Sequence, residues 1–195
     1  RNPETTKLIA DYQPSIIFHL AAQVDVRASV EDPLTDAETN LLGLIRVLEG
    51  GRTAKTGKII FASSGGTIYG EPEAKQLPLK EETQWNPSSP YGISKLAGGL
   101  YIKTYSSLHG LKGTTLALAN VYGPRQDPHG EAGVVAIFAG KLLNREPCTI
   151  YGSGTQTRDF VYVEDVASAF VASIENGDGK LFNIGCLLYT SPSPR

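Results

Sequence analysis

Short apolar runs alternate with longer amphipathic segments along most of the chain. Because such runs are too short for helices and have few charges, they predict buried strands, at 15–20, 58–63 and 114–119. Apolar residues recur at helical spacing between them, which predicts helices at 3–12, 33–54 and 90–109. Buried strands that alternate with helices are typical of a parallel sheet covered on both faces. We therefore expect a doubly wound α/β fold.

The alternation loosens after residue 119. There the sequence predicts a polar loop at 120–132, helices at 132–144 and from about 164 to 175, and short strands at 149–151, 160–163 and 181–184. We therefore divide the chain into 1–119, a mixed segment 120–185 and a tail at 186–195. The connections at 21–32 and 64–89 are polar, and the second is long enough to indicate a functional or mobile loop.

The helix at 90–109 brings Tyr91 and Lys95 together, since residues four apart lie on one helix face. Ser89 is a good N-cap, Pro90 suits the first helical position, and Gly110 suits the C-terminal end. A nearby ammonium favours the phenolate, so we expect Lys95 to lower the pKa of Tyr91 and make it a usable base. The alternative is a packed aromatic beside a solvated lysine.

Composition narrows the classes of partner. The chain has 195 residues, with 18 basic and 20 acidic side chains and a net charge of −2, so no basic field indicates nucleic acid or a membrane surface. No apolar run approaches the roughly 20 residues that span a bilayer. Cys148 and Cys186 have neither metal-ligand nor disulfide spacing, which predicts plain thiols in a cytoplasmic protein with no metal site.

Three further motifs accompany the Tyr-Lys pair in a fixed order. They are His19-Leu20-Ala21-Ala22 after the first strand, Ser63-Ser64-Gly65-Gly66-Thr67-Ile68-Tyr69-Gly70 after the second, and Asn120-Val121-Tyr122-Gly123-Pro124-Arg125. Together they resemble the extended short-chain dehydrogenase/reductase superfamily, the NAD-dependent nucleotide-sugar epimerases and dehydratases, over roughly residues 1–185. The likeness is greatest to UDP-glucose 4-epimerase-like members.

The resemblance implies a Rossmann-like domain that lacks its first βαβ portion, followed by the start of a smaller substrate-binding lobe. The glycine-rich turn that would bind the cofactor pyrophosphate is not in the chain, and the sequence contains no methionine. We therefore expect a fragment that is inactive by itself and binds NAD poorly, with a foreign or truncated tail at 186–195. The complete protein is expected to be a homodimer.

The resemblance also implies roles for the reacting groups. Tyr91 would be the base, and Lys95 would bind the nicotinamide ribose. A hydroxyl near the end of the second strand would bond the same sugar oxygen, and both Ser64 and Thr67 are candidates, because the loop has one residue more than in many relatives. Structural capping is the alternative for the serines.

Cofactor and substrate contacts follow from the same resemblance. Ala21, Ala22, Asn40 and Ser63 would line the NAD site with the Tyr-Lys pair; a purely structural bond is the alternative for Asn40. Asn120 and Arg158 would contact the diphosphate of a nucleotide sugar, although Arg158 could instead pair with an aspartate, either Asp159 or Asp165. For His19 we expect a hydrogen-bonded structural role.

Overall fold

Four parallel strands form the central sheet of the computed structural model, in the order β1-β2-β3-β6. The structure describes residues 4–72, 77–128, 133–155, 157–185 and 190–192. The four strands are β1 (Ile16–His19), β2 (Lys58–Ser64), β3 (Lys112–Leu118) and β6 (Leu181–Ile184). All four point the same way, so their carboxyl ends meet at one edge of the sheet.

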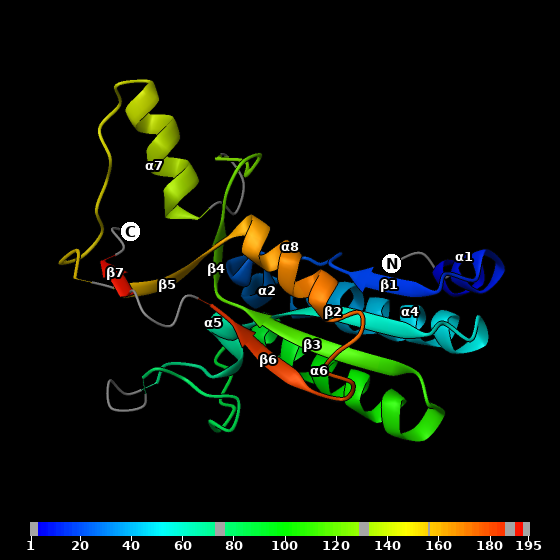
Figure 1. Ribbon diagram of the computed structural model, residues 1–195. Coiled ribbons are helices and arrows are strands. Elements are labelled where there is room, and N and C mark those ends of the chain that lie inside the picture. The colour runs from blue at the N-terminus through cyan, green and yellow to red at the C-terminus, as the bar shows by residue number, and fades with distance from the viewer. Residues whose placement is uncertain (1–3, 73–76, 129–132, 156, 186–189, 193–195) are drawn as a thin grey trace.

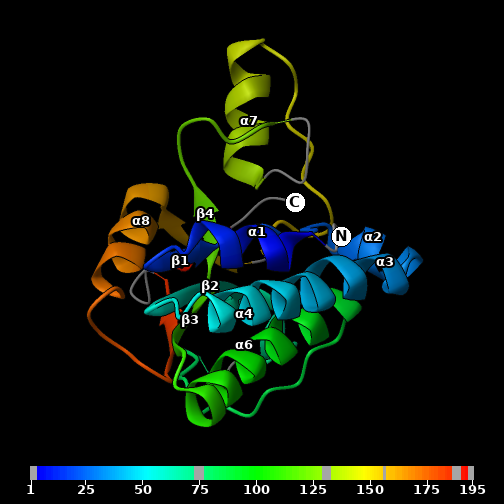
Figure 2. The same cartoon turned by 90° about the vertical axis from the view of Figure 1, so that its right-hand side faces the viewer.

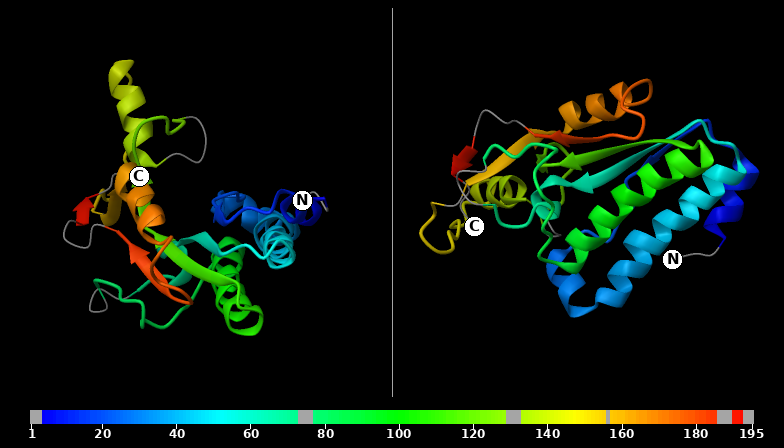
Figure 3. Two further views of the ribbon diagram at one scale, coloured as in Figure 1. Left: turned by 45° about the vertical axis from the view of Figure 1, so that its right-hand side comes forward. Right: turned by 90° about the horizontal axis from the view of Figure 1, so that it is seen from below.

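Helices cover both faces of this sheet (Figure 1). Three of them lie along one face, as Figure 2 shows: α1 (Thr5–Tyr12), α4 (Gly43–Thr53) and α6 (Pro90–His109). Helix α8 (Val163–Ala172) lies over the other face (Figure 3). The predicted Rossmann-like arrangement is therefore confirmed for this part of the sheet.

The remaining elements are short and lie around the carboxyl edge or beyond it. Near the edge are α2 (Val26–Glu31), α3 (Pro33–Ala37), the π-helical turn η1 (Glu38–Leu42) and α5 (Gly65–Ile68). A second sheet has the order β4-β5-β7, built from β4 (Asn120–Tyr122), β5 (Thr157–Tyr162) and β7 (Thr190–Pro192). Helix α7 (Val134–Leu143) projects from the body and has no buried residue (Figure 1).

Most sequence-predicted elements are present, and four predictions fail. The loop expected at 21–32 contains α2, and the loop at 64–89 begins with α5. The polar loop from residue 120 begins with strand β4, because that segment pairs with β5. The strand expected at 149–151 does not form; Ile150 is 55% exposed there, and an apolar run becomes a strand only beside a partner.

Part of the predicted tail lies within the described residues. Strand β7 pairs antiparallel with β5, with Thr190 opposite Asp159. The rest of that tail, 186–189 and 193–195, lies outside the described residues.

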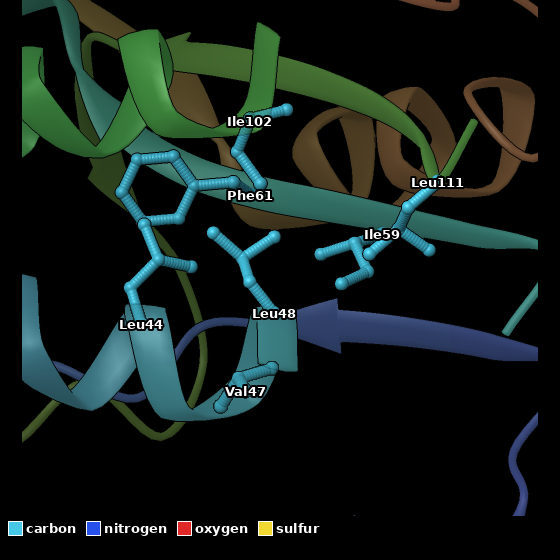
Figure 4. Close-up of a cluster of buried hydrophobic side chains, with 7 residues drawn as sticks. All are labelled: Leu44, Val47, Leu48, Ile59, Phe61, Ile102 and Leu111. Carbon is cyan, nitrogen blue, oxygen red and sulfur yellow. The ribbon is translucent and has the colours of Figure 1, made fainter. Parts of the chain in front are cut away.

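Strand β2 divides the core into two layers because its side chains alternate between the faces of the sheet. Ile59 and Phe61 point toward α4 and α6 (Figure 4) and belong to a buried cluster of Leu44, Val47, Leu48, Ile59, Phe61, Ile102 and Leu111. Ile60 and Ala62 point the other way and pack with Val166 and Phe170 of α8. Both faces of the strand are thus buried, as its apolar run predicts.

Helix α6 approaches the sheet closely at Gly98. A Cβ atom at this position would lie 2.7 Å from Cζ of Phe61, so the contact excludes any larger residue without movement of the helix or the ring. The helix has the predicted caps: the Ser89 hydroxyl accepts the Gly92 amide at 3.1 Å, and Gly110 ends the helix at φ 67°. Its first turn is therefore held in place locally as well as by packing.

An ion-pair cluster closes the amino end of the sheet. Lys58 at the start of β2 is buried, and its Nζ lies 2.6 Å from Oδ1 of Asp178. Lys112 at the start of β3 reaches the second oxygen of the same carboxylate at 3.0 Å. Both lysines lower the pKa of Asp178 below its ordinary value. A buried ammonium is costly unless it is paired, and this carboxylate supplies the charge partner.

A buried histidine ends strand β1. The His19 ring stacks on Phe61 with centroids 5.9 Å apart, and its Nε2 has no hydrogen-bond partner among the described residues. Burial, together with the charge of Lys95, lowers the pKa of His19 to about 4. The expectation of a hydrogen-bonded structural histidine is therefore wrong for this nitrogen.

No helix among the residues that the structure describes is both long and apolar enough to cross a lipid bilayer.

His19 should make folding sensitive to acid. The pKa of His19 in the folded protein is about 4, below the ordinary 6.5. Between pH 6.5 and 4 the imidazole is therefore protonated more in the unfolded chain than in the folded one, and the free energy of unfolding decreases as the pH falls. At pH 5 the loss should be roughly 2 kcal/mol relative to pH 7.5. Thermal unfolding of wild type and His19→Asn at both pH values measures it: the variant should lose less stability on acidification. Equal losses would contradict the assignment.

Candidate active site

The carboxyl edge of the sheet brings together the end of β2 and the first turn of α6. Ser64 is the last residue of β2, and Tyr91 is the second residue of α6. The Ser64 side chain hydrogen-bonds the Tyr91 phenol, and this bond favours the ionised form of the phenol. A hydroxyl and a phenol from distant parts of the chain are therefore already in contact at the edge where such sheets bind ligands.

Lys95 lies one helical turn after Tyr91 and is buried. Its Nζ donates to the Ala62 carbonyl of β2 at 2.9 Å and lies 5.7 Å from the centroid of the Tyr91 ring. Burial lowers the pKa of Lys95 to about 8, and the nearby carboxylate of Asp36 opposes part of that effect. The predicted Tyr-Lys face thus exists, with the ammonium anchored to the end of β2.

The predicted effect on Tyr91 is wrong in direction. Burial raises the pKa of the Tyr91 phenol above its ordinary 10.0, the Ser64 bond opposes this, and the charge of Asp36 adds to the rise. The Lys95 ammonium, which we expected to lower this pKa, donates to a backbone carbonyl instead. At neutral pH the phenol therefore carries its proton in this structure.

The two candidate hydroxyls differ in what they contact. Ser64 bonds the phenol, whereas the Thr67 hydroxyl points back along its own turn and donates to the Ser64 carbonyl at 3.5 Å. Thr67 is on α5, a single turn whose Gly65 is seated against the Ala117 carbonyl. The geometry favours Ser64 as the hydroxyl that acts with Tyr91.

Two of the predicted cofactor residues make structural bonds. The Ser63 hydroxyl is buried and donates to the Lys95 carbonyl at 3.2 Å, which joins β2 to α6. Asn40 pairs with the backbone of Gln23 as a neighbouring strand would: its Oδ1 accepts the Gln23 amide at 2.8 Å and its Nδ2 donates to the Gln23 carbonyl at 2.9 Å. Contact of either residue with a cofactor remains a prediction.

The segment after β1 carries the predicted cofactor-side alanines. Ala21 is exposed and Ala22 is half-buried, and the Asn40 pairing holds the backbone directly after them. Small side chains at the end of a parallel strand leave room for a dinucleotide to approach the backbone. His19, whose buried Nε2 has no hydrogen-bond partner in the described part of the chain, ends the strand before this segment.

Asn120 and Arg158 lie on adjacent strands of the second sheet. Asn120 begins β4, and its Nδ2 donates to the Asp159 carbonyl of β5 at 2.9 Å. Arg158 is half-buried, and its Nη1 donates to the Thr157 carbonyl at 2.7 Å. The same strands line a pocket of about 320 Å³, referred to below as the hollow. Its lining includes Tyr122, Phe160, Tyr162, Asp165 and Asn183. This hollow lies beside the predicted substrate residues and does not include the Tyr-Lys pair.

Sequence reasoning missed the buried polar residues behind the site. Asp36 is fully buried in α3 and bonds Ser94, which precedes Lys95 on α6. Ser29 is also fully buried, and its hydroxyl accepts the Tyr91 amide at 3.2 Å. The spacing of four residues between Asp36 and Asn40 was a usable signal, since it places both on one helix face.

The model of the family described as "NAD dependent epimerase/dehydratase family" matches residues 1–185. A curated relative, the UDP-glucose 4-epimerase of Mycolicibacterium smegmatis, is 48% identical over 189 residues, covering 96% of this chain. The chain spans 60% of the length of that relative. A dehydratase is also among the relatives: the dTDP-glucose 4,6-dehydratase of Salmonella typhimurium is 33% identical over 199 residues, 93% of this chain and 54% of its own.

Solved structures agree with the fold. The UDP-glucose 4-epimerase of Thermotoga maritima, determined with UDP-glucose, superposes with a TM-score of 0.91 at 44% identity, covering 96% of this chain and 62% of its own. The UDP-glucose 4-epimerase of Thermus thermophilus, in complex with NAD, gives a TM-score of 0.88 at 43% identity, covering 94% of this chain and 60% of its own. The family model and these likenesses show that the chain belongs to the NAD dependent epimerase/dehydratase family.

Proposed function

We propose that the complete enzyme containing this chain is an NAD-dependent nucleotide-sugar 4-epimerase of the UDP-glucose/UDP-galactose type. The observation that carries the proposal is the Tyr91-Lys95 face at the carboxyl edge of a parallel sheet, where the buried Lys95 bonds the end of β2 and Ser64 lies beside the phenol. The UDP-glucose 4-epimerases of Mycolicibacterium smegmatis and Thermotoga maritima, at 48% and 44% identity, support the choice of reaction.

The residues at the edge of the sheet fit a nicotinamide dinucleotide. Ala21 and Ala22 present little side chain after β1, and His19 at the end of that strand has a buried Nε2 with no hydrogen-bond partner among the residues described. An ammonium has three N–H donors, and the Ala62 carbonyl accepts one from Lys95. Lys95 would use another to bind the ribose beside the nicotinamide. Bound NAD would supply the hydride acceptor for C4 of the sugar, and its cationic ring would favour the Tyr91 phenolate.

Tyr91 and Ser64 would handle the proton at the reacting oxygen. The base must remove the proton of the sugar 4-hydroxyl as C4 is oxidised, and return it when the 4-keto sugar is reduced. Ser64 already bonds the phenol in a way that favours its ionised form, so it both assists Tyr91 and can bond the same sugar oxygen. Reversible oxidation inverts C4 if the 4-keto sugar turns over in the pocket before reduction.

Asn120 and Arg158 would hold the nucleotide diphosphate. They lie on paired parallel strands, with Asn120 opposite Phe160, two residues after Arg158. A guanidinium forms paired, charge-assisted bonds with phosphate oxygens. The neighbouring hollow offers aromatic walls from Tyr122 and Phe160. We place the substrate between this sheet and the Tyr-Lys pair.

A sugar 4,6-dehydratase or a decarboxylase of the same family is the alternative reaction. The dehydratase branch has an Asp-Glu pair just before the loop's Tyr-Gly, and here Gly66-Thr67 stands in that place. A Cβ atom at Gly66 would meet nothing within 4 Å, so the position is open but carries no acid. Epimerisation needs no further acid or base than the groups present. A noncatalytic dinucleotide-binding protein would have no need of the Ser64 contact with Tyr91.

We also propose that the complete enzyme is a cytoplasmic homodimer. Large apolar side chains of α6 are exposed along one side of the helix, at Ile93, Leu100, Tyr101 and Leu108. A stripe of this kind on a helix favours burial against a partner helix.

Tyr91→Phe should remove the base while leaving the fold intact. In the complete enzyme we expect turnover to fall by about 10²–10⁴-fold, which is typical of lost acid–base catalysis. Steady-state kinetics with UDP-glucose, together with thermal unfolding, separates chemistry from stability. Near-normal turnover in this variant would remove Tyr91 from the role.

Ser64→Ala should reduce turnover more than Thr67→Ala does. The Ser64 bond favours the ionised phenol, so its removal should also move the acid limb of the kcat–pH profile to higher pH. The Thr67 hydroxyl contacts a backbone carbonyl, and its removal should leave that limb in place. A shift caused by Thr67→Ala and absent from Ser64→Ala would reverse the assignment.

Product analysis separates the reaction types. The complete enzyme given UDP-glucose should form the 4-epimer, UDP-galactose, with no net change in NADH absorbance. Chromatography and mass spectrometry of the products measure this. Accumulation of a 4-keto-6-deoxy sugar, which is lighter by one water, would instead establish the dehydratase reaction.

A further inference from the structure

A buried carboxylate lies behind the Tyr-Lys pair, and the roles described above do not use it. Asp36 of α3 is 0% exposed. Burying a carboxylate is costly unless hydrogen bonds replace its lost water. Three side chains from different segments supply these bonds, and they lie on two sides of the candidate site.

One oxygen of Asp36 holds helix α6. The Ser94 hydroxyl donates to Oδ2 at 2.7 Å, and Ser94 is itself buried. It stands between Tyr91 and Lys95 on the first two turns of the helix. The bond therefore fixes the rotation and height of the turn that carries both of these residues.

The other oxygen of Asp36 holds the segment after β1. Oδ1 accepts Nδ2 of Asn40 at 2.8 Å and Nε2 of Gln23 at 3.3 Å. The Asn40 amide in turn pairs with both backbone groups of Gln23. Gln23 directly follows Ala21 and Ala22, so the carboxylate sets where the predicted cofactor-side backbone lies.

We propose that Asp36 is a positioning residue that fixes the cofactor-side segment after β1 relative to the Tyr91-Lys95 turn of α6. The inference deepens the proposed function, on which its catalytic part rests. In this role Asp36 touches neither sugar nor cofactor; it acts through Ser94, Asn40 and Gln23. Hydride transfer requires the nicotinamide and the base to be correctly placed relative to the same sugar carbon. A misplacement of about 1 Å can lower the rate 10²-fold.

The type of side chain supports positioning over plain packing. An apolar residue of similar volume would fill the same space without the cost of burying a charge. Asp36 also acts on both functional groups electrostatically: its charge opposes the lowering of the Lys95 pKa by burial and adds to the rise of the Tyr91 pKa that burial causes. A second contact also positions the helix: the Ser29 hydroxyl accepts a hydrogen bond from the Tyr91 amide and so joins α2 to α6.

The test compares Asp36→Ala, Asp36→Asn and Ser94→Ala in the full-length enzyme. Asp178→Ala is the matched control, because it removes a carboxylate from buried Lys58 at the opposite end of β2. Asp36→Asn is the conservative variant: its oxygen can accept from Asn40 and Gln23, and its amide can donate to Ser94.

Four measurements are made on each protein: thermal unfolding, NAD affinity by calorimetric titration of the cofactor-free protein, kcat and KM with UDP-glucose, and amide hydrogen exchange. Asp36→Ala should lower kcat and NAD affinity by roughly 10- to 100-fold each, with KM for the sugar nearly unchanged. Exchange at the Gln23 and Tyr91 amides should become faster. Asp36→Asn should recover most of both losses, whereas Asp178→Ala should lose stability alone.

Normal kcat and NAD affinity in Asp36→Ala, or equal losses in Asp178→Ala, would overturn the inference. If Asp36→Ala does not fold, Ser94→Ala decides. It frees only the helix turn that carries Tyr91 and Lys95, so kcat should fall about tenfold, and NAD affinity should fall less than in a variant that also frees the segment after β1. Normal kcat in Ser94→Ala would refute the role. If wild type forms no 4-epimer, the proposed function fails. The inference is then judged by NAD affinity and hydrogen exchange, which need no sugar.

Discussion

The close seating of helix α6 on strand β2 is the constraint on which the candidate site depends. Gly98 lets the helix approach Phe61, and the Ser63 hydroxyl and the Lys95 ammonium then bond across the gap, to the Lys95 and Ala62 carbonyls. An α-helix rises about 1.5 Å per residue, so a slip of one position would break both bonds. The same seating places Tyr91 against Ser64. The relative positions of Tyr91 and Ser64 therefore depend on how α6 packs against β2 at Gly98 and Phe61.

The site gathers ionisable groups that would each be more stable in water. Lys95 and His19 both have their pKa lowered by burial, and Asp36 is fully enclosed. Such groups remain in a fold when their bonds hold one arrangement of the chain, and strained or costly features concentrate where function requires them. The apolar layers on either side of β2 supply the stability that this arrangement lowers.

Local signals explain what the sequence could predict, and distant partners explain the rest. The caps of α6 and the spacing of Tyr91 and Lys95 depend on neighbouring residues alone, and both are present in the structure. The pKa of Tyr91 depends on burial and on Asp36, a residue far away in sequence, so no local pattern gives its direction. Strand pairing is equally nonlocal: β4 looks like loop and forms beside β5, whereas Ile150 looks like strand and has no strand partner among the described residues.

Strand β2 carries charge at one end and reactive hydroxyls at the other. Lys58 and Asp178 lie at its amino end, and Ser64 with Tyr91 lies at its carboxyl end, six residues or roughly 20 Å away. An apolar strand with covered faces fills that span, and substitutions more than about 10 Å apart that share no partner usually have independent effects. Substitutions at the ion-pair end of β2 can therefore change the stability of the fold without changing the reacting groups. Substitutions at the carboxyl end can change substrate binding without weakening the ion pairs.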